Sequence, residues 1–416
     1  KYLRKIYNEH SEYTDKASIY AKSYLKKGIL SKDSLRIAKG YFLLSTIAKD
    51  SLKLTYLNIA INLSKEYSNK YYPATFYFHK GDYYTDNANY KEALDNYFTS
   101  YRMAKKHNNN VLAYDSKFNI GSLKNRIGKH EEGLEIFKEF YNYIISEESE
   151  YPKDYYSNLI GLFALSDSYT KLQKLDTATT INKKGIKISL LHNDNDMYHY
   201  FIMNEGVNLF FKKEYKRSID SLKKVIPNLI ELEDKSNEIF SRFYLGKSYF
   251  ESGKVDNAIS QFRTTDSLFN NFKDLFPELR EGYKILINYY KNKNDDERQL
   301  FYLNRLISVD SVLNSDYKYI NDKIVKDFDT SNLISEKEKL IFKLNRSNSF
   351  KSKGIIFLII VFVIVLSFLI FNYKKRRLYK QKFESLMNLK DNESNNGNNE
   401  IEKRKFYSLS EEVIKA

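Results

Sequence analysis

Histidines and clustered acidic residues are the side chains in this sequence whose types could support catalysis or metal binding. No two histidines flank a glutamate at the four-residue spacing that lets one helix face bind zinc. The chain has no cysteine, which excludes disulfides and thiolate metal sites. The histidines are His10, His79, His107, His130, His192 and His199. The sequence therefore predicts neither a metal site nor a catalytic histidine.

Two acidic clusters and the scattered glycines have simpler explanations than ion or phosphate binding. "HNDND" at 192–196 and "NDDE" at 294–297 carry oxygen ligands that calcium prefers, but both stand at predicted turns. We favour solvated turns over calcium sites at both places. The glycines stand singly, so no phosphate-binding loop is formed, and no G-x-S-x-G nucleophile motif occurs. We therefore predict that the chain is not an enzyme and binds no cofactor.

The single glycines instead belong to a pattern that predicts pairs of packed helices. It is clearest in "GDYYTDNANYKEALDNYF" at 81–98, "GSLKNRIGKHEEGLEIF" at 121–137 and "GKSYFESGKVDNAISQF" at 246–262. In each, a small residue is followed after twelve positions by another small residue and after sixteen by an aromatic one. Two small residues let helix backbones approach closely, and the aromatic ring fills the space beside them. A glycine or asparagine in the turn ends the first helix.

Weaker copies extend this pattern along the chain at a spacing of about 40 residues. They begin at Ser166 and Gly206, while Gly40 and the region of Tyr289 mark an earlier and a later unit. One pair of helices cannot bury its apolar face alone, so such units stack into a solenoid. The 4 prolines and 14 glycines in 416 residues leave long helices with few breakers. The predicted fold class is all-α, with a solenoid of helical pairs over residues 1–313.

This pattern resembles the tetratricopeptide repeat, whose signature joins L-G-x-x-Y to later small and aromatic residues. "YLGKSYFESGKVDNAISQF" at 244–262 is the best match, and the resemblance covers roughly residues 16–313. The usual unit has about 34 residues and a leading tryptophan. These units are longer, and the chain has no tryptophan. HEAT-like helical pairs are the alternative.

The resemblance implies a right-handed superhelix whose concave groove binds a peptide or protein. The first helix of each pair lines such a groove, so groove positions are expected next to the pattern glycines. The alternative is a solvated inner face, with the aromatic residues packed between neighbouring units. The groove candidates are Asp82, Thr85, Asp86, Ser122, Asn125, Arg126, Phe210, Phe211, Lys247, Phe250 and Glu251.

The stretch "GIIFLIIVFVIVLSFLIF" at 354–371 predicts a transmembrane helix at 354–373 in a single-pass inner membrane protein. Its length is roughly 27 Å, close to a bilayer core, and its apolar side chains contribute about −6 kcal/mol to insertion. Lys374, Lys375, Arg376 and Arg377 follow directly, which predicts a cytoplasmic C-terminal tail and periplasmic repeats. Over a wider window basic residues also precede the span, and no secretion signal is visible. The rest of the net charge of +15 is a general compositional bias.

Residues 314–353 and 374–416 flank this span. Apolar residues in 319–353 recur at spacings of mostly three, four or seven, which predicts a long helix with a break near 330–332. It either forms a stalk that dimerises the chain or packs on the last repeat. After the span we expect a basic helix to about Leu389, a disordered linker, "KDNESNNGNNE", and a capped helix start, "SLSEEVIKA". So short a helix is unstable alone and is expected to lead into another domain.

The order of these parts resembles membrane-anchored bacterial regulators that carry an AraC-type helix-turn-helix domain at their C-terminus. "VDSVLN" at 309–314, "YKKRRLYKQKFESLM" at 373–387 and "LSEEVIKA" at 409–416 carry the resemblance. It implies a sensory half that binds a peptide or protein and reaches DNA only through a domain after Ala416. The alternatives are the input half of a sensor histidine kinase and a membrane-anchored scaffold without an output domain.

Overall fold

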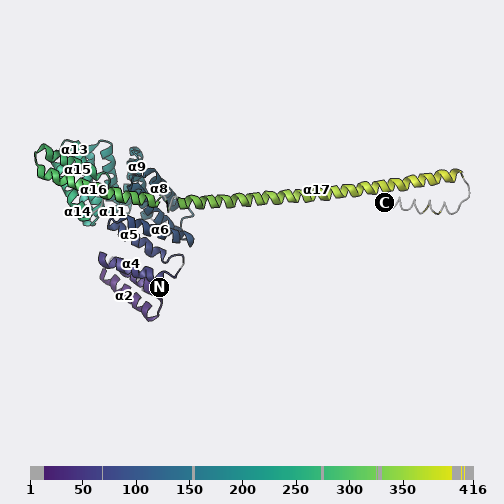
Figure 1. Ribbon diagram of the computed structural model, residues 1–416, viewed down its shortest axis with the longest axis horizontal. Helices are drawn as coiled ribbons and strands as arrows, with labels where there is room; N and C mark the ends of the chain where they lie inside the picture. The colour runs from purple at the N-terminus through teal and green to yellow at the C-terminus, as the bar shows by residue number, and fades with distance from the viewer. Residues whose placement is uncertain are drawn as a thin grey trace. The chain divides into compact units, whose positions relative to one another are not determined.

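The computed structural model describes residues 14–67, 69–151, 155–272, 276–324, 326, 330–395, 404 and 407. Over these residues the regular secondary structure is helical and contains no strand (Figure 1). The chain divides into two units, Lys1–Thr330 and Ser331–Ala416, which are described in turn. The predicted all-α fold class is confirmed.

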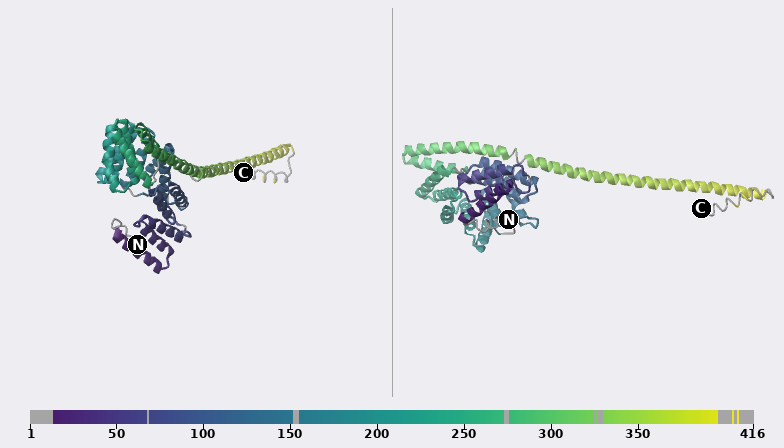
Figure 2. Two further views of the ribbon diagram at one scale, coloured as in Figure 1. Left: turned by 60° about the vertical axis from the view of Figure 1, so that its left-hand side comes forward. Right: turned by 90° about the horizontal axis from the view of Figure 1, so that it is seen from below.

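The first unit is a stack of helices in which each helix packs against the next one along the chain (Figure 2). Its helices are α2 (Thr14–Leu30), α3 (Ser34–Ser45), α4 (Asp50–Ser64), α5 (Ala74–Asp86), α6 (Tyr90–Lys106), α7 (Asn110–Arg126), α8 (His130–Ile145), α9 (Tyr155–Lys171), α10 (Leu175–Leu191), α11 (Asn195–Phe211), α12 (Tyr215–Glu231), α13 (Lys235–Glu251), α14 (Val255–Phe272), α15 (Leu279–Asn292) and α16 (Asp296–Lys323). The helical-pair solenoid predicted from the glycine pattern is therefore present.

Helix length explains why the sequence pattern repeats at a longer interval than the usual unit. Each of α9 to α13 has 17 residues. Short connections join them, such as residues 212–214 between α11 and α12. The first helices α9, α11 and α13 therefore begin 40 residues apart, at Tyr155, Asn195 and Lys235. In this part of the stack the extra length lies in the helices rather than in the loops.

The helices end in a repeated turn in which one residue has a left-handed backbone. After α11, Lys213 has a φ of 63°, and the backbone N–H of Glu214 donates to Leu209 O at 2.9 Å. This bond satisfies a carbonyl that the helix end leaves without a partner. The residues in this position are Lys32, Ala88, Asn108, Gly128, Gln173, Asn193, Lys213, Glu233, Gly253 and Asn294. In the turns that end the first helices of the pairs from α5 to α15, the predicted glycine or asparagine is present at Gly128, Gly253 and Asn294, whereas Ala88, Gln173 and Lys213 occupy the position in the others.

Both acidic clusters lie in these turns, where an aspartate caps the following helix. Asp194 Oδ1 accepts the backbone N–H of Met197 at 3.0 Å, and Asp295 Oδ1 accepts that of Arg298 at 3.1 Å. Each carboxylate satisfies a helix N–H that has no partner within the helix. The turn interpretation of both clusters is therefore confirmed.

The pattern glycines sit where the second helix of a pair comes closest to the first. A Cβ on Gly81 would lie 2.6 Å from the ring of Tyr97, and one on Gly246 would lie 2.9 Å from Phe262. The second small residue packs at the same contact, since Ser218 Oγ donates to Gly206 O at 2.7 Å. The small–small–aromatic packing predicted from the sequence is therefore observed.

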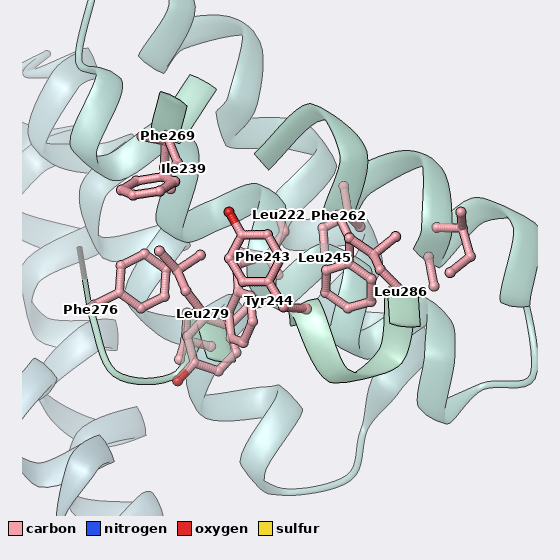
Figure 3. Close-up of a cluster of buried hydrophobic side chains, with 14 of the residues drawn as sticks. Leu222, Ile239, Phe243, Tyr244, Leu245, Phe262, Phe269, Phe276, Leu279 and Leu286 are labelled. Carbon is pink, nitrogen blue, oxygen red and sulfur yellow. The ribbon is translucent and has the colours of Figure 1, made fainter. Parts of the chain in front are cut away.

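Two large hydrophobic cores hold the stack together. One joins residues of α11 to α16, and Figure 3 shows its centre around Phe243, Tyr244, Phe262 and Phe276. The other joins α6 to α9, with Tyr90, Leu94 and Phe137 among its members. The second core also includes Ile320 and Ile324, from the far end of the solenoid.

Helix α16 is 28 residues long and runs without a break through residue 313, where the sequence predicts the solenoid to end. Val309 and Leu313 belong to the core of α11 to α16. Ile320, at the end of α16, is fully buried against the other core, as is Ile324 just beyond it. In the first part of the predicted stalk, Tyr317 thus packs against the core of α11 to α16, whereas Ile320 and Ile324 pack in the core of α6 to α9.

The second unit is built on one long helix, α17 (Thr330–Asn395), which begins at the predicted break. Ser352–Asn388 within it is long and apolar enough to cross a membrane by length and composition. The predicted span at 354–373 lies inside this stretch, and Ile334 and Ile341 before it are exposed. The helix continues through residues 390–395, where the sequence predicts the start of a linker. The predicted helix start at 408–416 lies outside the described residues.

Candidate ligand-binding cavity

The first unit contains a cavity of about 680 Å³ between successive first helices of the repeats. Helices α7, α9, α11 and α13 supply most of its wall, and residues 276–278, just before α15, close one side. A volume of this size is typical of sites that hold a small molecule or a few side chains of a peptide. Its wall includes the side chains of Ser122, Asn125, Arg126, His130, Phe163, Asp167, Lys171, Met203, Asn204, Asn237, Phe240, Phe276 and Glu278.

A chain of polar contacts crosses the cavity wall from α8 to α9. His130 Nδ1 lies 2.7 Å from Asn125 Oδ1, and Asn125 Nδ2 donates to Asp167 Oδ2 at 2.8 Å. Lys171 Nζ lies 3.0 Å from the same carboxylate oxygen. Burial, and then the positive charge of Lys171, lower the pKa of His130. A neutral imidazole with its proton on Nδ1 fits this arrangement, because Asn125 Oδ1 then accepts from it.

Arg126 lies at one end of the cavity and connects it to the core of α6 to α9. Its guanidinium carbon is 4.1 Å from the centre of the Tyr90 ring, at the start of α6. A cation over an aromatic face is attracted by the ring quadrupole. The charged side chains that line the cavity, Arg126 and Lys171 against Asp167 and Glu278, balance in sign.

The opposite wall is aromatic and apolar. The rings of Phe240 and Phe276 meet at 5.5 Å with an interplanar angle of 70°, an edge-to-face arrangement. Asn204, on α11, links this helix to α9, because its Nδ2 donates to Ser166 Oγ on α9 at 2.7 Å. The cavity thus combines rings that accept apolar side chains with amide and charged groups that bond polar ones.

Three of the predicted groove residues line this cavity: Ser122, Asn125 and Arg126, all on α7. Ser122 is exposed, whereas Asn125 is 4% exposed and its side chain is bonded on both sides as described above. The sequence pattern therefore placed the α7 residues on the cavity wall, although their role in binding stays a prediction.

The predicted residues of α5 lie outside the cavity and bond within the protein. Asp82 Oδ1 accepts from Tyr97 OH at 3.0 Å, and Thr85 Oγ1 lies 3.0 Å from the same hydroxyl. Asp86 is exposed and forms an ion pair with Lys53 at 3.5 Å. Asp82 and Thr85 thus hold the second helix of their own pair.

The predicted residues of α11 and α13 also lie outside the cavity. Phe210 and Phe211 pack beside Tyr244, with ring centres 5.4 and 5.8 Å from its own. Lys247 Nζ bonds Glu281 at 2.6 Å, while Phe250 and Glu251 are exposed. For Phe210 and Phe211 the structure supports the alternative interpretation, in which aromatic residues pack between neighbouring units.

Sequence reasoning missed the cavity residues contributed by later elements, including Asp167, Lys171, Phe240 and Phe276. One signal was available, because side chains about one repeat apart meet: Asn125 bonds Asp167, 42 positions later, and Asn204 bonds Ser166, 38 positions earlier. The residues about 40 positions after each α7 candidate lie in this part of α9. No such signal marks Phe276, which precedes α15 in a connection outside the helical pattern.

Comparison with solved structures finds several that are similar to this chain, and the likeness to RapI supports the fold. The apo form of RapI has a TM-score of 0.51 and 17% sequence identity, over 65% of this chain and 96% of RapI. Aspartyl phosphate phosphatase F from Bacillus subtilis matches with a TM-score of 0.48 and 19% identity, over 63% of this chain and 67% of that one. A Rap protein complexed with competence and sporulation factor matches with a TM-score of 0.47 and 13% identity, over 75% of this chain and 99% of that one. No protein-family model and no curated protein sequence matches the chain.

The helical pairs and the likeness to RapI together define the class of fold. The chain has a tetratricopeptide-like helical solenoid and, near its C-terminal end, one apolar helix that is a candidate membrane span.

Proposed function

We propose that the solenoid binds an extended peptide or protein segment in this cavity and serves as the sensory part of a membrane-anchored signalling protein. The observation that carries the proposal is the composition of the cavity wall, where three asparagines and four charged residues face aromatic rings. Amide and charged groups bond an extended backbone, and aromatic pockets take its side chains. Asp167 pairs with Lys171 and His130 is bonded to Asn125, which favours binding over catalysis.

A cavity-filling variant tests this binding. Ser122 is exposed on the cavity wall and its hydroxyl bonds only Phe118 O in its own helix, at 3.2 Å, so Ser122→Trp fills the cavity without opening the core. Thr180→Trp is the matched control, because Thr180 is an exposed α10 residue whose hydroxyl bonds Asp176 O at 2.9 Å and which lies off the cavity wall. The full chain is incubated in detergent with a pool of synthetic hexapeptides, and bound peptides are identified by mass spectrometry.

We expect the wild type and Thr180→Trp to retain the same few peptides and Ser122→Trp to lose them. Retention of these peptides by Ser122→Trp would place binding elsewhere on the protein. If no peptide is retained by the wild type, peptide binding in the cavity is wrong.

We propose further that α17 anchors the chain with the solenoid outside the membrane. The support is the apolar stretch within Ser352–Asn388 and the basic cluster Lys374, Lys375, Arg376 and Arg377 that follows its apolar core. Cytoplasmic segments next to a span carry an excess of lysine and arginine. Reporter fusions after Lys390 and before Lys16 test the topology, and two reporters on the same side of the membrane would contradict it.

The resemblance to AraC-type regulators extends this proposal to the output. We infer that binding in the solenoid controls a DNA-binding domain encoded after Ala416. Sequencing of the coding DNA beyond Ala416 tests it, because two helix-turn-helix patterns would support a regulator. A histidine-bearing dimerisation helix with a nucleotide lid would indicate a sensor kinase instead, and an early stop would leave an anchored scaffold.

A further inference from the structure

Helix α16 performs two separate packing roles. Its first part completes the last helical pair, where Tyr302 stacks on Tyr290 with ring centres 5.6 Å apart and Val309 is 1% exposed in the core. Its last part, residues 314–324 with the cap, continues past that pair and contacts α6, more than 200 positions earlier in the sequence. We call residues 314–324 the α16 extension. It is the link by which the last repeat touches an early one.

The contact of the α16 extension with α6 has an apolar centre and a polar rim. Ile320 and Ile324 are both 0% exposed and pack in the core that contains Tyr90 and Leu94. Around them, Asp95 on α6 accepts from Tyr319 OH at 3.1 Å and pairs with Lys323 Nζ at 3.1 Å, while Lys91 Nζ donates to Ser315 Oγ at 3.2 Å. A contact with matched charges and two buried side chains is specific, yet small enough to open without unfolding the repeats.

The cavity touches both sides of this contact. Arg126 lines the cavity and lies over Tyr90, which packs in the same core as Ile320 and Ile324. Phe276 lines the opposite side and belongs to the core that holds Val309 and Leu313 of α16. Through Arg126, Tyr90 therefore joins the cavity wall to the core that buries Ile320 and Ile324.

We propose that the α16 extension is a switch: an anionic group of a bound segment draws Arg126 away from Tyr90, the contact with α6 opens, and occupancy of the cavity is passed along the chain to α17. This inference rests on the proposed binding of a peptide or protein segment. A charge-assisted, bidentate bond to a carboxylate is stronger than a partly exposed cation–π contact, so Arg126 changes partner when such a group enters. Because α17, which begins at Thr330, is the next helix along the chain, the released segment is the one that leads to the candidate membrane helix.

The coupling between cavity and switch is testable without knowing the natural partner. Amide hydrogen exchange of the full chain in detergent micelles is measured by mass spectrometry for peptides covering 314–324 and, as an internal reference, for peptides covering 299–313. The variant Arg126→Gln removes the cation from Tyr90. We expect exchange in the α16 extension to rise about fivefold, while the first part of α16 is unchanged.

Two further variants distinguish an effect of the Arg126 cation on the α16 extension from a general destabilisation of the cavity wall. Arg126→Lys keeps a cation at this position and should restore most of the protection, whereas a purely structural loss would not recover. Lys171→Gln removes the other cation of the cavity wall, one that contacts Asp167 rather than Tyr90, and should leave exchange in the α16 extension unchanged.

Unchanged exchange in Arg126→Gln would overturn the switch even if the cavity binds hexapeptides. An equal rise in Lys171→Gln would also overturn it, because any disturbance of the cavity would then act on α16. Conversely, a rise confined to Arg126→Gln in a protein that retains no hexapeptide would leave the switch standing and the proposed ligand class wrong.

Discussion

A half-buried carboxyl group on α7, that of Asp115, predicts that part of the stability of the solenoid falls as the pH rises. Burial raises the pKa of Asp115 to about 6, even though a bond from Tyr151 opposes the shift. Tyr151 OH lies 2.5 Å from Asp115 Oδ1 and 3.0 Å from Val111 O, yet a hydroxyl has a single proton to donate. Protonation of Asp115 reverses this bond, because the carboxyl then donates to Tyr151 while Tyr151 donates to Val111. Both contacts are satisfied in the protonated form, which burial favours.

The sign and size of the effect follow from the pKa. In the unfolded chain the carboxyl titrates near its model value of 3.8, so the folded state holds the proton more tightly. The stabilisation is complete below that value and is lost as the pH rises through about 6. A difference of about two pKa units corresponds to about 3 kcal/mol of unfolding free energy, an upper bound for this single group.

The variant Asp115→Asn isolates this contribution, because its amide is neutral at every pH and still bonds Tyr151. Urea unfolding of the full chain in detergent is followed by circular dichroism at about pH 4.5 and pH 8. We expect Asp115→Asn to gain about 2 kcal/mol relative to the wild type between these two conditions, because part of the effect is already lost at about pH 4.5. Asp176→Asn is the control, because Lys212 lowers the pKa of that exposed carboxyl and the sign of its effect is opposite. A constant difference between wild type and Asp115→Asn across this range would refute the reasoning.

Three further predictions concern packing and backbone, and urea unfolding measures each. Lys213→Gly should stabilise the protein by about 1 kcal/mol, because Lys213 holds a φ of 63° that glycine adopts freely. Gly246→Ala should destabilise it by about 1–3 kcal/mol, because the new Cβ meets the ring of Phe262 at 2.9 Å. Ile320→Ala should cost about 2–5 kcal/mol if the contact with α6 is part of the cooperative fold.

Each of these predictions has a matched control and a contradicting result. For Lys213→Gly the control is Lys183→Gly, inside α10, which should lose about 1 kcal/mol, and equal losses would contradict the turn argument. Gly354→Ala is the control for Gly246→Ala. A Cβ at position 354 has nothing within 4 Å, so this substitution should leave the unfolding free energy nearly unchanged. Ile307, on α16 but 66% exposed, is the control for Ile320, and equal small effects would mean that the contact with α6 contributes little.

The sequence predicted the solenoid because its determinants are local. The spacing of Gly246, Ala258 and Phe262 is set by two helices and one turn, and each residue does in the structure what its type suggests. The turn at Lys213 escaped prediction for the opposite reason, since the left-handed backbone there is imposed by packing of the flanking helices rather than by the residue itself. Position in the repeat, and not residue type, marks these turns.

The cavity was predictable only in part, because its wall depends on how successive repeats turn around the superhelix axis. Asn125 and Arg126 follow from their place beside Gly121 on a first helix. Phe276 and Glu278 reach the same cavity from several repeats away. That approach depends on the curvature of the whole stack, which no short motif encodes. The predicted candidates of α5 and α13 fail to line the cavity for the same reason.

The α16 extension bears on the two interpretations of residues beyond 313, a stalk that dimerises the chain and a helix that packs on the solenoid. The apolar spacing that suggested a dimerising stalk includes Ile320 and Ile324, and both are buried against α6 of the same chain. Burying each isoleucine contributes about 1.5–3 kcal/mol. Packing on α6 of the same chain costs no translational entropy, whereas binding a second copy of the chain does. The same two side chains cannot fill both contacts. Dimerisation through this part of the stalk therefore requires that the contact with α6 first open, so any ligand that opens it also makes the seam available to a second copy.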